Sequence, residues 1–366
     1  MANKKTSNRN RWISTILAML GSVVVLVVLF MKIDIRWEEV RDQWRRIHLP
    51  MLGLAIGVSL FWHVVLGADK WYRILKRLGA RVTWWEVFSV RLGSDPVRFA
   101  APFKSGEIVN AAYLYQKGYL DFPRACSSIA FDKVLNFLAT IFWLMVGMAT
   151  ISFAHISWKP EMMSKLGVML LVGAGCMGLL VFEPFRLLLA RVAGRIHPKL
   201  GRLFDGGLAP FREMTVRQKC FFLLYGVFFL LRPLILLYLL FVSFGVQPSI
   251  NEVIAFGSVA VLMSNVPLTQ AGIGPREAAI VWLFSHYVNQ EAMLVSIGLL
   301  MSFAIHIAPA LLGIPLAPRV LRASAAAAAG RITGVATGSA EMDGTEAVAL
   351  SGAPAAGRAG GGSAAS

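Results

Sequence analysis

Six long apolar windows constrain this chain more than any other feature of its sequence. They lie at 13–31, 50–68, 129–154, 166–182, 220–244 and 292–316. A helix needs about 20 residues to cross the hydrocarbon core of a bilayer, and each window is close to that length or longer. Of the 366 residues, 57% are apolar and only 15% are charged, which is not the composition of a water-soluble domain. The sequence therefore predicts an all-α polytopic membrane protein with about six full spans.

Two further apolar segments, 84–115 and 253–284, are interrupted near their middle by proline, glycine and charged residues. The expected structural breaks are at Pro102, Gly106, Pro267, Gly272 and Gly274. Non-helical backbone is tolerated at membrane depth where it is buried in protein or faces water. We therefore expect each segment to be a broken, re-entrant helix that leaves the membrane on the side from which it entered. The alternative is two ordinary kinked helices whose charged side chains snorkel to the membrane surface.

Charge indicates how this topology is oriented. With both broken segments re-entrant, one face of the membrane holds 24 basic and 8 acidic residues, and the other holds 7 of each. Short cytoplasmic loops accumulate Lys and Arg, so we expect a cell (inner) membrane protein with both termini in the cytoplasm. The two broken segments are then oppositely oriented. Such inverted repeats are typical of transporters whose binding site lies near the midplane.

The chain divides into one membrane domain with short flanking segments. Residues 1–12 form a basic N-terminus, 13–318 the membrane domain, and 319–366 an Ala/Gly-rich tail whose composition predicts disorder. The cytoplasmic loop 186–219 carries eight bases and two acids among leucines, so we expect it to contact anionic lipids of the inner leaflet. No nucleic-acid partner is expected.

Charged residues at the breaks and inside the spans are the candidate residues for substrate binding and translocation. A charge at membrane depth costs several kcal/mol unless it lines a protected or wet cavity. Buried bases suit a phosphate group, and carboxylates can neutralise those bases or exchange protons. The candidates are Asp95, Arg98, Lys104, Glu107, Asp132, Lys133, Arg232, Arg276 and Glu277.

Structural roles for several candidates stay open at this point. Arg232, near the middle of its window, either binds the substrate or forms a buried ion pair with a carboxylate, because a guanidinium binds phosphate and carboxylate alike. The carboxylates considered for that pair are Asp95, Glu107 and Glu277. Glu107 and Glu277 each follow a break, where either side chain could instead accept hydrogen bonds from the first turn of a half-helix.

Neither a metal nor a cofactor is predicted. His63 and His306 lie in apolar spans without a second ligand at metal-binding spacing, so each is interpreted as a hydrogen-bonded core histidine. Cys126, Cys176 and Cys220 are too widely spaced for a zinc motif or a disulfide framework. The sequence has no nucleotide-binding phosphate loop, so any transport would be driven by a gradient or run downhill.

The spacing of these motifs resembles the lysylphosphatidylglycerol synthase transmembrane-region family over roughly residues 10–318. The resemblance rests on the two breaks, from Pro102 to Glu107 and from Pro267 to Glu277, and on the charged pair Asp132 and Lys133. It implies a flippase-like protein that moves lipids or lipid-linked groups between leaflets. The chain departs from the family pattern at Asn110 and Asn136, which stand where members tend to carry charge. We also expect no soluble aminoacyl-transferase domain after the last span, so lipid synthesis is not implied.

The sequence therefore predicts a lipid flippase rather than an enzyme, and its expected partner is a membrane phospholipid or lipid-linked substrate. One alternative is a membrane-embedded lipid-modifying enzyme that uses Asp95, Glu107 and Asp132 as acid and base groups. Another is a non-transporting partner of a lipid-synthesising or glycosyl-transferring complex. Both a homo-oligomer and a complex with a lipid-synthesis partner remain open.

Overall fold

The computed structural model describes residues 37–100, 106–150, 191, 195, 214–264, 272–285, 288 and 290–322. Every regular element within these ranges is helical, as the sequence predicts. Four helical segments there are long and apolar enough to cross a membrane, and they correspond to four of the six predicted spans. These segments are Leu49–Arg77, Phe122–Met148, Val216–Ser243 and Glu291–Gly313. The windows at 13–31 and 166–182 lie outside the described residues.

The first half of the described chain contains two long helical rods separated by two shorter helices. The short helix α2 (Trp37–Arg45) precedes the first rod, which is continuous. That rod consists of α3 (Leu49–Phe61), a π-helical turn η1 (Trp62–Leu66) and α4 (Gly67–Arg77). The shorter helices are α5 (Trp84–Ala100) and α6 (Ile108–Gln116), and the second rod is α7 (Phe122–Thr150). The described part of α5 ends at Ala100 and α6 begins at Ile108, just after the predicted break at Gly106.

The second half repeats this order. The first rod consists of α12 (Val216–Phe229) and α13 (Leu231–Ser243), which meet at Leu230. The shorter helices are α14 (Ile250–Met263) and α15 (Pro275–Phe284). The last rod consists of α16 (Glu291–Ser302), the π-helical turn η4 (Phe303–Ile307) and α17 (Ala308–Gly313). The interruption between α14 and α15 again falls where the sequence places a break.

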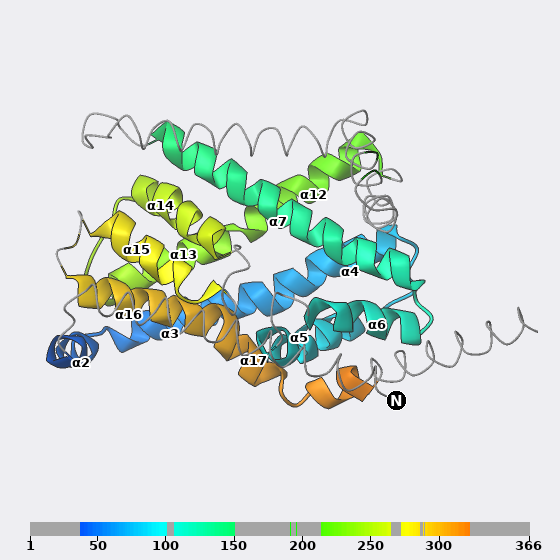
Figure 1. Cartoon of the computed structure of the whole chain (residues 1–366), viewed down its shortest axis with the longest axis horizontal. Coiled ribbons are helices and arrows are strands. Elements are labelled where there is room, and N and C mark those ends of the chain that lie inside the picture. Colours follow the sequence, from blue (N-terminus) through cyan, green and yellow to red (C-terminus); the bar gives the residue numbers. More distant parts are fainter. Residues whose placement is uncertain are drawn as a thin grey trace, which may run out of the picture.

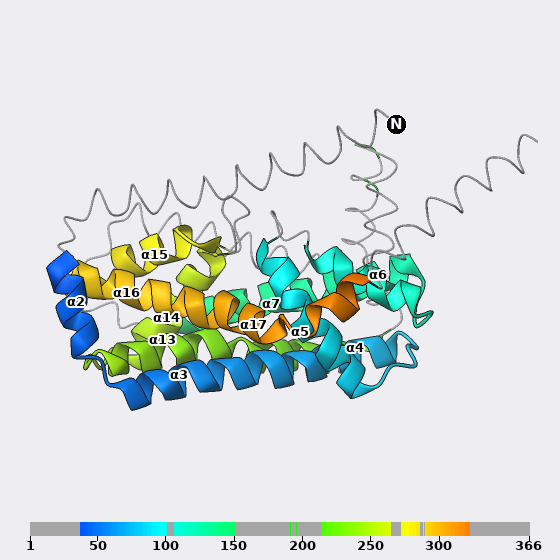
Figure 2. The same ribbon diagram turned by 90° about the horizontal axis from the view of Figure 1, so that it is seen from below.

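Hydrogen bonds define one end of the bundle. The backbone N–H of His48, just before α3, donates to the carbonyl of Ser243 at the end of α13, with an N···O distance of 2.9 Å. The side chain of Asn251, in the first turn of α14, donates to the carbonyl of Thr150 at the end of α7. Both α14 and α15 lie at this end, beside α2 (Figures 1 and 2).

The opposite end is formed by the last turns of α4 and α6 and the first turns of α7 and α12. Leu78, Leu120, Met214 and Phe222 are buried there in one apolar cluster. The α5–α6 pair begins and ends at this end, whereas the α14–α15 pair begins and ends at the other (Figure 1). Both pairs therefore reach the middle of the bundle from opposite ends, and this arrangement positions the candidate site.

Glycines allow each short-helix pair to pack closely against a rod from the other half. A Cβ atom placed on Gly147 of α7 would lie 2.4 Å from Cα of Ala255 in α14. One placed on Gly313 of α17 would lie 2.1 Å from the carbonyl oxygen of Leu92 in α5. Small residues permit such close helix approach in membrane proteins. The two halves are therefore interlocked, with α14 packed on α7 and α5 packed on α17.

Two boundaries differ from the sequence prediction. The first rod continues as helix to Arg77, beyond the predicted end of the span at 68, because α4 buries an apolar face that includes Trp71 and Ile74. Residues 317–322 are helical, so helix extends into the segment predicted to be a disordered tail from 319. Val320 is buried against α5, near Gly93, which accounts for this extension. Residues 1–36, most of 186–219, and 323–366 lie outside the described residues.

Candidate functional site

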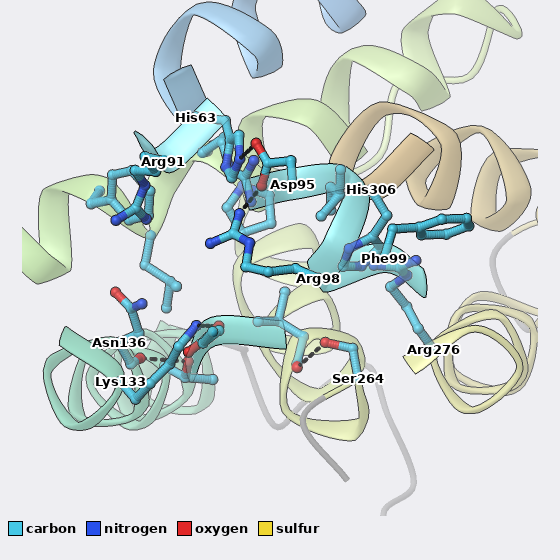
Figure 3. A pocket seen from close by; sticks show the side chains of 18 residues that line it. His63, Arg91, Asp95, Arg98, Phe99, Lys133, Asn136, Ser264, Arg276 and His306 are labelled. Atoms are coloured by element: carbon cyan, nitrogen blue, oxygen red, sulfur yellow. Dashed lines mark hydrogen bonds and ion pairs between the residues drawn. The ribbon is translucent and has the colours of Figure 1, made fainter. Parts of the chain in front are cut away.

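A polar cavity of about 220 Å³ lies where the two short-helix pairs meet the rods. Its walls come from η1, the end of α5, the middle of α7, the α12–α13 junction, the end of α14, the start of α15, and η4. Figure 3 shows side chains from these distant parts of the sequence converging on one space. Among the described residues that line it, five are cations and two are carboxylates: Arg91, Arg98, Lys133, Arg232, Arg276, Asp95 and Glu107.

Most of the residues predicted for the site are brought together by the fold. Six of the nine line the cavity directly, namely Asp95, Arg98, Glu107, Lys133, Arg232 and Arg276. Asp132 and Glu277 do not line it, but each contacts an arginine that does. Lys104, like the breaks Pro102 and Pro267, lies outside the described residues.

Asp95 is held between two basic side chains. Nε2 of His63 lies 3.1 Å from Oδ2 of Asp95, and the Arg98 guanidinium contacts Oδ1. His63 belongs to the π-helical turn η1, and such turns recur at functional sites. Figure 3 shows Arg98 between the His63–Asp95 pair and Lys133. His63 is thus a hydrogen-bonded core histidine, as the sequence predicts, and it also lines the cavity.

Asp132 anchors a second network beside the cavity. Its Oδ1 lies 2.7 Å from Nζ of Lys70, and its Oδ2 lies 3.9 Å from Nη1 of Arg91. Lys70 also donates to the side-chain oxygen of Asn136 at 2.5 Å. The sequence prediction did not include Lys70 or Arg91 among the candidates: Lys70 lies just beyond the predicted end of a span at 68, and Arg91 lies well before the predicted break of the segment 84–115. The spacing of Lys70 with its apolar neighbours Trp71, Ile74 and Leu75 was the available signal, since it is typical of one buried helix face.

Glu107 and Glu277, predicted to play equivalent parts, differ in their contacts. Glu107 precedes α6 but makes no capping hydrogen bond, and its carboxylate contacts the ammonium of Lys133 instead. Glu277 accepts from the backbone N–H of Gly274 at 2.6 Å and therefore caps α15. Gly274 has φ +104°, a conformation that L side chains rarely adopt. The structural alternative raised for these residues thus describes Glu277 and not Glu107.

Arg276 completes the wall at the start of α15. Its guanidinium contacts the hydroxyl of Ser302, and that hydroxyl contacts Oε1 of Glu277. Nη2 of Arg276 lies 3.5 Å from the same carboxylate oxygen. The Arg276 side chain is only 2% exposed, and its Nε has no hydrogen-bond partner among the described residues. The arginine is therefore held in place while one donor remains unpaired.

Arg232 differs from the other cations because no carboxylate pairs with it within the described ranges. Its Nε and Nη1 are buried and make no hydrogen bond there, and its Cζ lies 5.9 Å from the centre of the Phe229 ring. The helix is interrupted just before it, at Leu230, and Pro233 cannot donate a backbone hydrogen bond to the preceding turn. The proposed ion pair with Asp95, Glu107 or Glu277 is not formed. Arg232 therefore offers an uncompensated positive charge to the cavity.

The described part of the chain contains no group of three or more His, Cys, Asp and Glu side chains arranged to hold a metal ion. Within the described ranges, the lining side chains that keep unpaired hydrogen-bond donors are those of Arg91, Arg232 and Arg276. Arginines that converge in a cavity and keep unpaired N–H groups suit the oxygen atoms of a phosphate or carboxylate.

The apolar helices define a multi-pass membrane protein, and a cavity lined by basic side chains lies at its centre. Its chain belongs to the lysylphosphatidylglycerol synthase TM region family, whose model matches residues 13–338. This match confirms the resemblance stated from the motifs, and it extends further towards the C-terminus than those motifs. A comparison with curated proteins found no match.

Proposed function

We propose that this protein moves an anionic lipid or lipid-linked intermediate between membrane leaflets, with the central cavity as the site for the head group. Arg232, whose guanidinium has no carboxylate partner among the described residues, carries this proposal, because a buried charge without a partner is costly and is kept where a ligand completes it. The cavity volume of about 220 Å³ is below the roughly 300–1,000 Å³ of pockets that enclose drug-sized ligands. A head group suits this space, with its lipid tails left outside.

The proposed topology has six full spans and two oppositely oriented re-entrant segments. The order of elements from Leu49 to Thr150 recurs from Val216 to Gly313, with each element running in the opposite direction along the bundle. Inverted repeats with broken helices that meet near the middle are typical of transporters that open their site alternately to each side. This likeness supports alternating access by movement of the two short-helix pairs.

The orientation follows from charge. The end of the bundle formed by α4, α6, α7 and α12 carries Arg77, Lys117, Arg124 and Lys219, whereas α14 and α16 begin at the other end with Glu252 and Glu291. Basic residues accumulate on the cytoplasmic side. We therefore place the α5–α6 end in the cytoplasm of a cell-membrane protein, with both termini on that side.

Ion pairing favours transport over catalysis. A catalytic acid or base must exchange its proton with the substrate, which requires a reachable carboxylate. Asp95, Glu107 and Asp132, the candidate acid and base groups, each contact a cation of the protein. We propose that these carboxylates position the cations around the head group and compete with it during the transport cycle.

The family name refers to lysylphosphatidylglycerol, but the cavity is a poor match for a lysyl head group. The lysyl group adds ammonium charges, which the arginines lining this space would repel. The departures at Asn110 and Asn136 are consistent with a different substrate. We therefore propose a head group that is anionic overall.

Leaflet exchange in proteoliposomes tests the proposal. Labelled anionic and zwitterionic lipids are reconstituted with the full chain, and the fraction that reaches the opposite leaflet is followed by quenching from outside. We expect selective exchange of an anionic lipid and its loss in Glu107→Gln and Arg232→Gln. Arg124→Gln is the matched control, because Arg124 is an exposed arginine at the start of α7. Absence of exchange for every lipid, with folding verified, would contradict autonomous transport and favour an enzyme or a partner subunit.

A further inference from the structure

We infer that the cavity selects a phosphate head group carrying two negative charges, such as a phosphomonoester or a diphosphate diester, over a monoanionic phosphodiester. The inference deepens the proposed function, on which it rests for assigning the phosphate to a lipid.

The charge balance around the cavity is the first observation. Among the described residues, the cations that line it, together with Lys70 on Asp132, number six: Lys70, Arg91, Arg98, Lys133, Arg232 and Arg276. The carboxylates that line the cavity or pair with these cations number four among the described residues: Asp95, Glu107, Asp132 and Glu277. Two positive charges remain, so an occupant with two negative charges makes this part of the site neutral.

The location of the excess is the second observation. Asp95 contacts Arg98, Glu107 contacts Lys133, and Glu277 contacts Arg276. Lys70 is closest to Asp132, at 2.7 Å, while Arg91 is 3.9 Å from that carboxylate. Arg232 has no carboxylate partner in the described ranges. The two charges left over therefore belong mainly to Arg91 and Arg232, and both side chains line the same cavity.

The unpaired donors are the third observation. Nε of Arg91, Nε of Arg276, and both Nε and Nη1 of Arg232 are buried without a hydrogen-bond partner among the described residues. Buried polar groups are almost always hydrogen-bonded, so unpaired donors on three side chains that line one cavity suit a ligand that supplies acceptors. A phosphomonoester presents three terminal oxygens, whereas a phosphodiester presents only two. The monoester matches the donor set more fully.

Burial makes this selection sharp. Arg91 and Arg276 are 8% and 1% exposed, and the cavity wall also contains Phe99, Leu230 and Ile305. Charges in such surroundings are poorly screened. A ligand with one negative charge fewer therefore loses more binding free energy here than it would at a surface. A diester or a zwitterionic head group would leave at least one of the excess cations uncompensated.

Ligand-induced stabilisation of the purified full chain tests the inference. The thermal midpoint in detergent is measured with short-chain phosphatidate, with phosphatidylmethanol and with phosphatidylcholine of the same chains. Phosphatidylmethanol differs from phosphatidate by one methyl ester, which removes one charge at nearly constant size. A ligand that binds the folded state raises the midpoint according to its concentration and affinity. We expect phosphatidate to bind at least about tenfold more tightly than phosphatidylmethanol, because a charged hydrogen bond is lost in the ester.

Two variants show whether the arginines cause the selectivity. Arg232→Gln should reduce the preference for phosphatidate over phosphatidylmethanol to less than about threefold, because one excess charge is gone. Arg124→Gln removes an exposed arginine elsewhere and should leave the preference unchanged. Equal affinities for phosphatidate and phosphatidylmethanol in the unaltered protein would overturn the inference. A preference that survives in Arg232→Gln would overturn the role of that arginine.

Glycerol phosphate is the probe for a soluble ligand. Stabilisation by phosphatidate but not by glycerol phosphate supports a lipid, whereas equal stabilisation by both overturns the assignment to a lipid.

Leaflet exchange separates the proposal of transport from the proposal of charge selection. Selective binding of phosphatidate without any exchange would contradict transport and support the charge selection. Exchange of phosphatidylmethanol as fast as that of phosphatidate would support transport and contradict the charge selection.

Discussion

Lys70 and Asp132 form a buried ion pair that joins α4 to α7, with 2.7 Å between Nζ and Oδ1. The Lys70 side chain is fully buried and that of Asp132 is 6% exposed. Phe229 covers the pair from α12, because the Lys70 ammonium lies 4.5 Å from the centre of its ring. Phe229 and Arg232 lie on either side of the helix interruption at Leu230, and the Arg232 Cζ is 5.9 Å from the centre of the same ring. A buried ion pair and a cation that has no carboxylate partner among the described residues therefore both lie next to one aromatic side chain.

Removing one member of the Lys70–Asp132 pair should destabilise the protein strongly. Asp132→Asn leaves the Lys70 ammonium buried without its carboxylate, and breaking a buried pair in this way typically costs about 3–5 kcal/mol. Unfolding of the purified protein in detergent, followed by helical circular dichroism, measures the change. The double variant Lys70→Met with Asp132→Leu should recover much of the loss, because no unpaired charge remains from the pair. A double variant as unstable as Asp132→Asn would contradict this explanation.

Arg232→Leu should have the opposite effect on the ligand-free protein. The guanidinium has no carboxylate partner among the described residues, so its removal eliminates a desolvation cost without breaking an ion pair. We expect the free energy of unfolding to stay the same or to rise by an amount on the order of 1 kcal/mol, while leaflet exchange is lost. Thermal unfolding and the exchange assay on one preparation measure both effects. A loss of several kcal/mol would instead show that Arg232 has a structural role.

The sequence predicted where helices break better than it predicted which side chains meet. Proline, glycine and charge within apolar segments are local signals, and they correctly placed the interruptions before Ile108 and before Pro275. The rods could be recognised because each is longer and more apolar than a helix of a soluble protein. Close helix contacts such as that of Gly147 with Ala255 could not be recognised from the sequence. Glycine and alanine fit many helix faces, so their positions do not show which helices will pack against each other.

Pairing within the site could not be derived from spacing along the chain. Lys70 and Asp132 are 62 positions apart, and only the crossing of α4 with α7 brings them together. Arg232 looked equally suited to an ion pair and to a ligand, because residue type does not distinguish these roles. At the α12–α13 junction its Nε and Nη1 have no hydrogen-bond partner among the described residues, which only the fold could show. Asn136, a departure from the family pattern, accepts a hydrogen bond from Lys70.

Gly147→Ala should weaken the crossing between α7 and α14. The added methyl group would lie 2.4 Å from Cα of Ala255, so the two backbones must separate. Such overpacking typically costs about 1–3 kcal/mol. Gly53→Ala is the matched control, because a Cβ atom at Gly53 of α3 would meet nothing within 4 Å. Thermal midpoints should fall for Gly147→Ala and stay near the original value for Gly53→Ala. An equal effect of both would mean that helix propensity, and not the crossing, sets the result.

Tyr119 should make stability depend on pH in the alkaline range. It lies between α6 and α7, and its hydroxyl donates to Oε2 of Glu86 at 2.5 Å. Only the protonated phenol can donate, so this hydrogen bond raises the pKa of Tyr119 from 10.0 to about 12. A raised pKa in the folded state means that the stabilisation is complete below about pH 10 and is lost as the pH rises from there to about 12.

Tyr119→Phe removes this titration and keeps the ring. The thermal midpoints of the unaltered protein and of Tyr119→Phe should differ by a constant amount at neutral pH. That difference should shrink above about pH 10, where the phenol of the unfolded chain ionises. Comparing the two proteins at each pH cancels the lysines, which titrate in the same range. Tyr113 also donates to Glu86, at 3.0 Å, so the contact between α5 and α6 survives in the variant. A difference that stays constant up to about pH 12 would show that the Tyr119 hydroxyl does not stabilise the fold through Glu86.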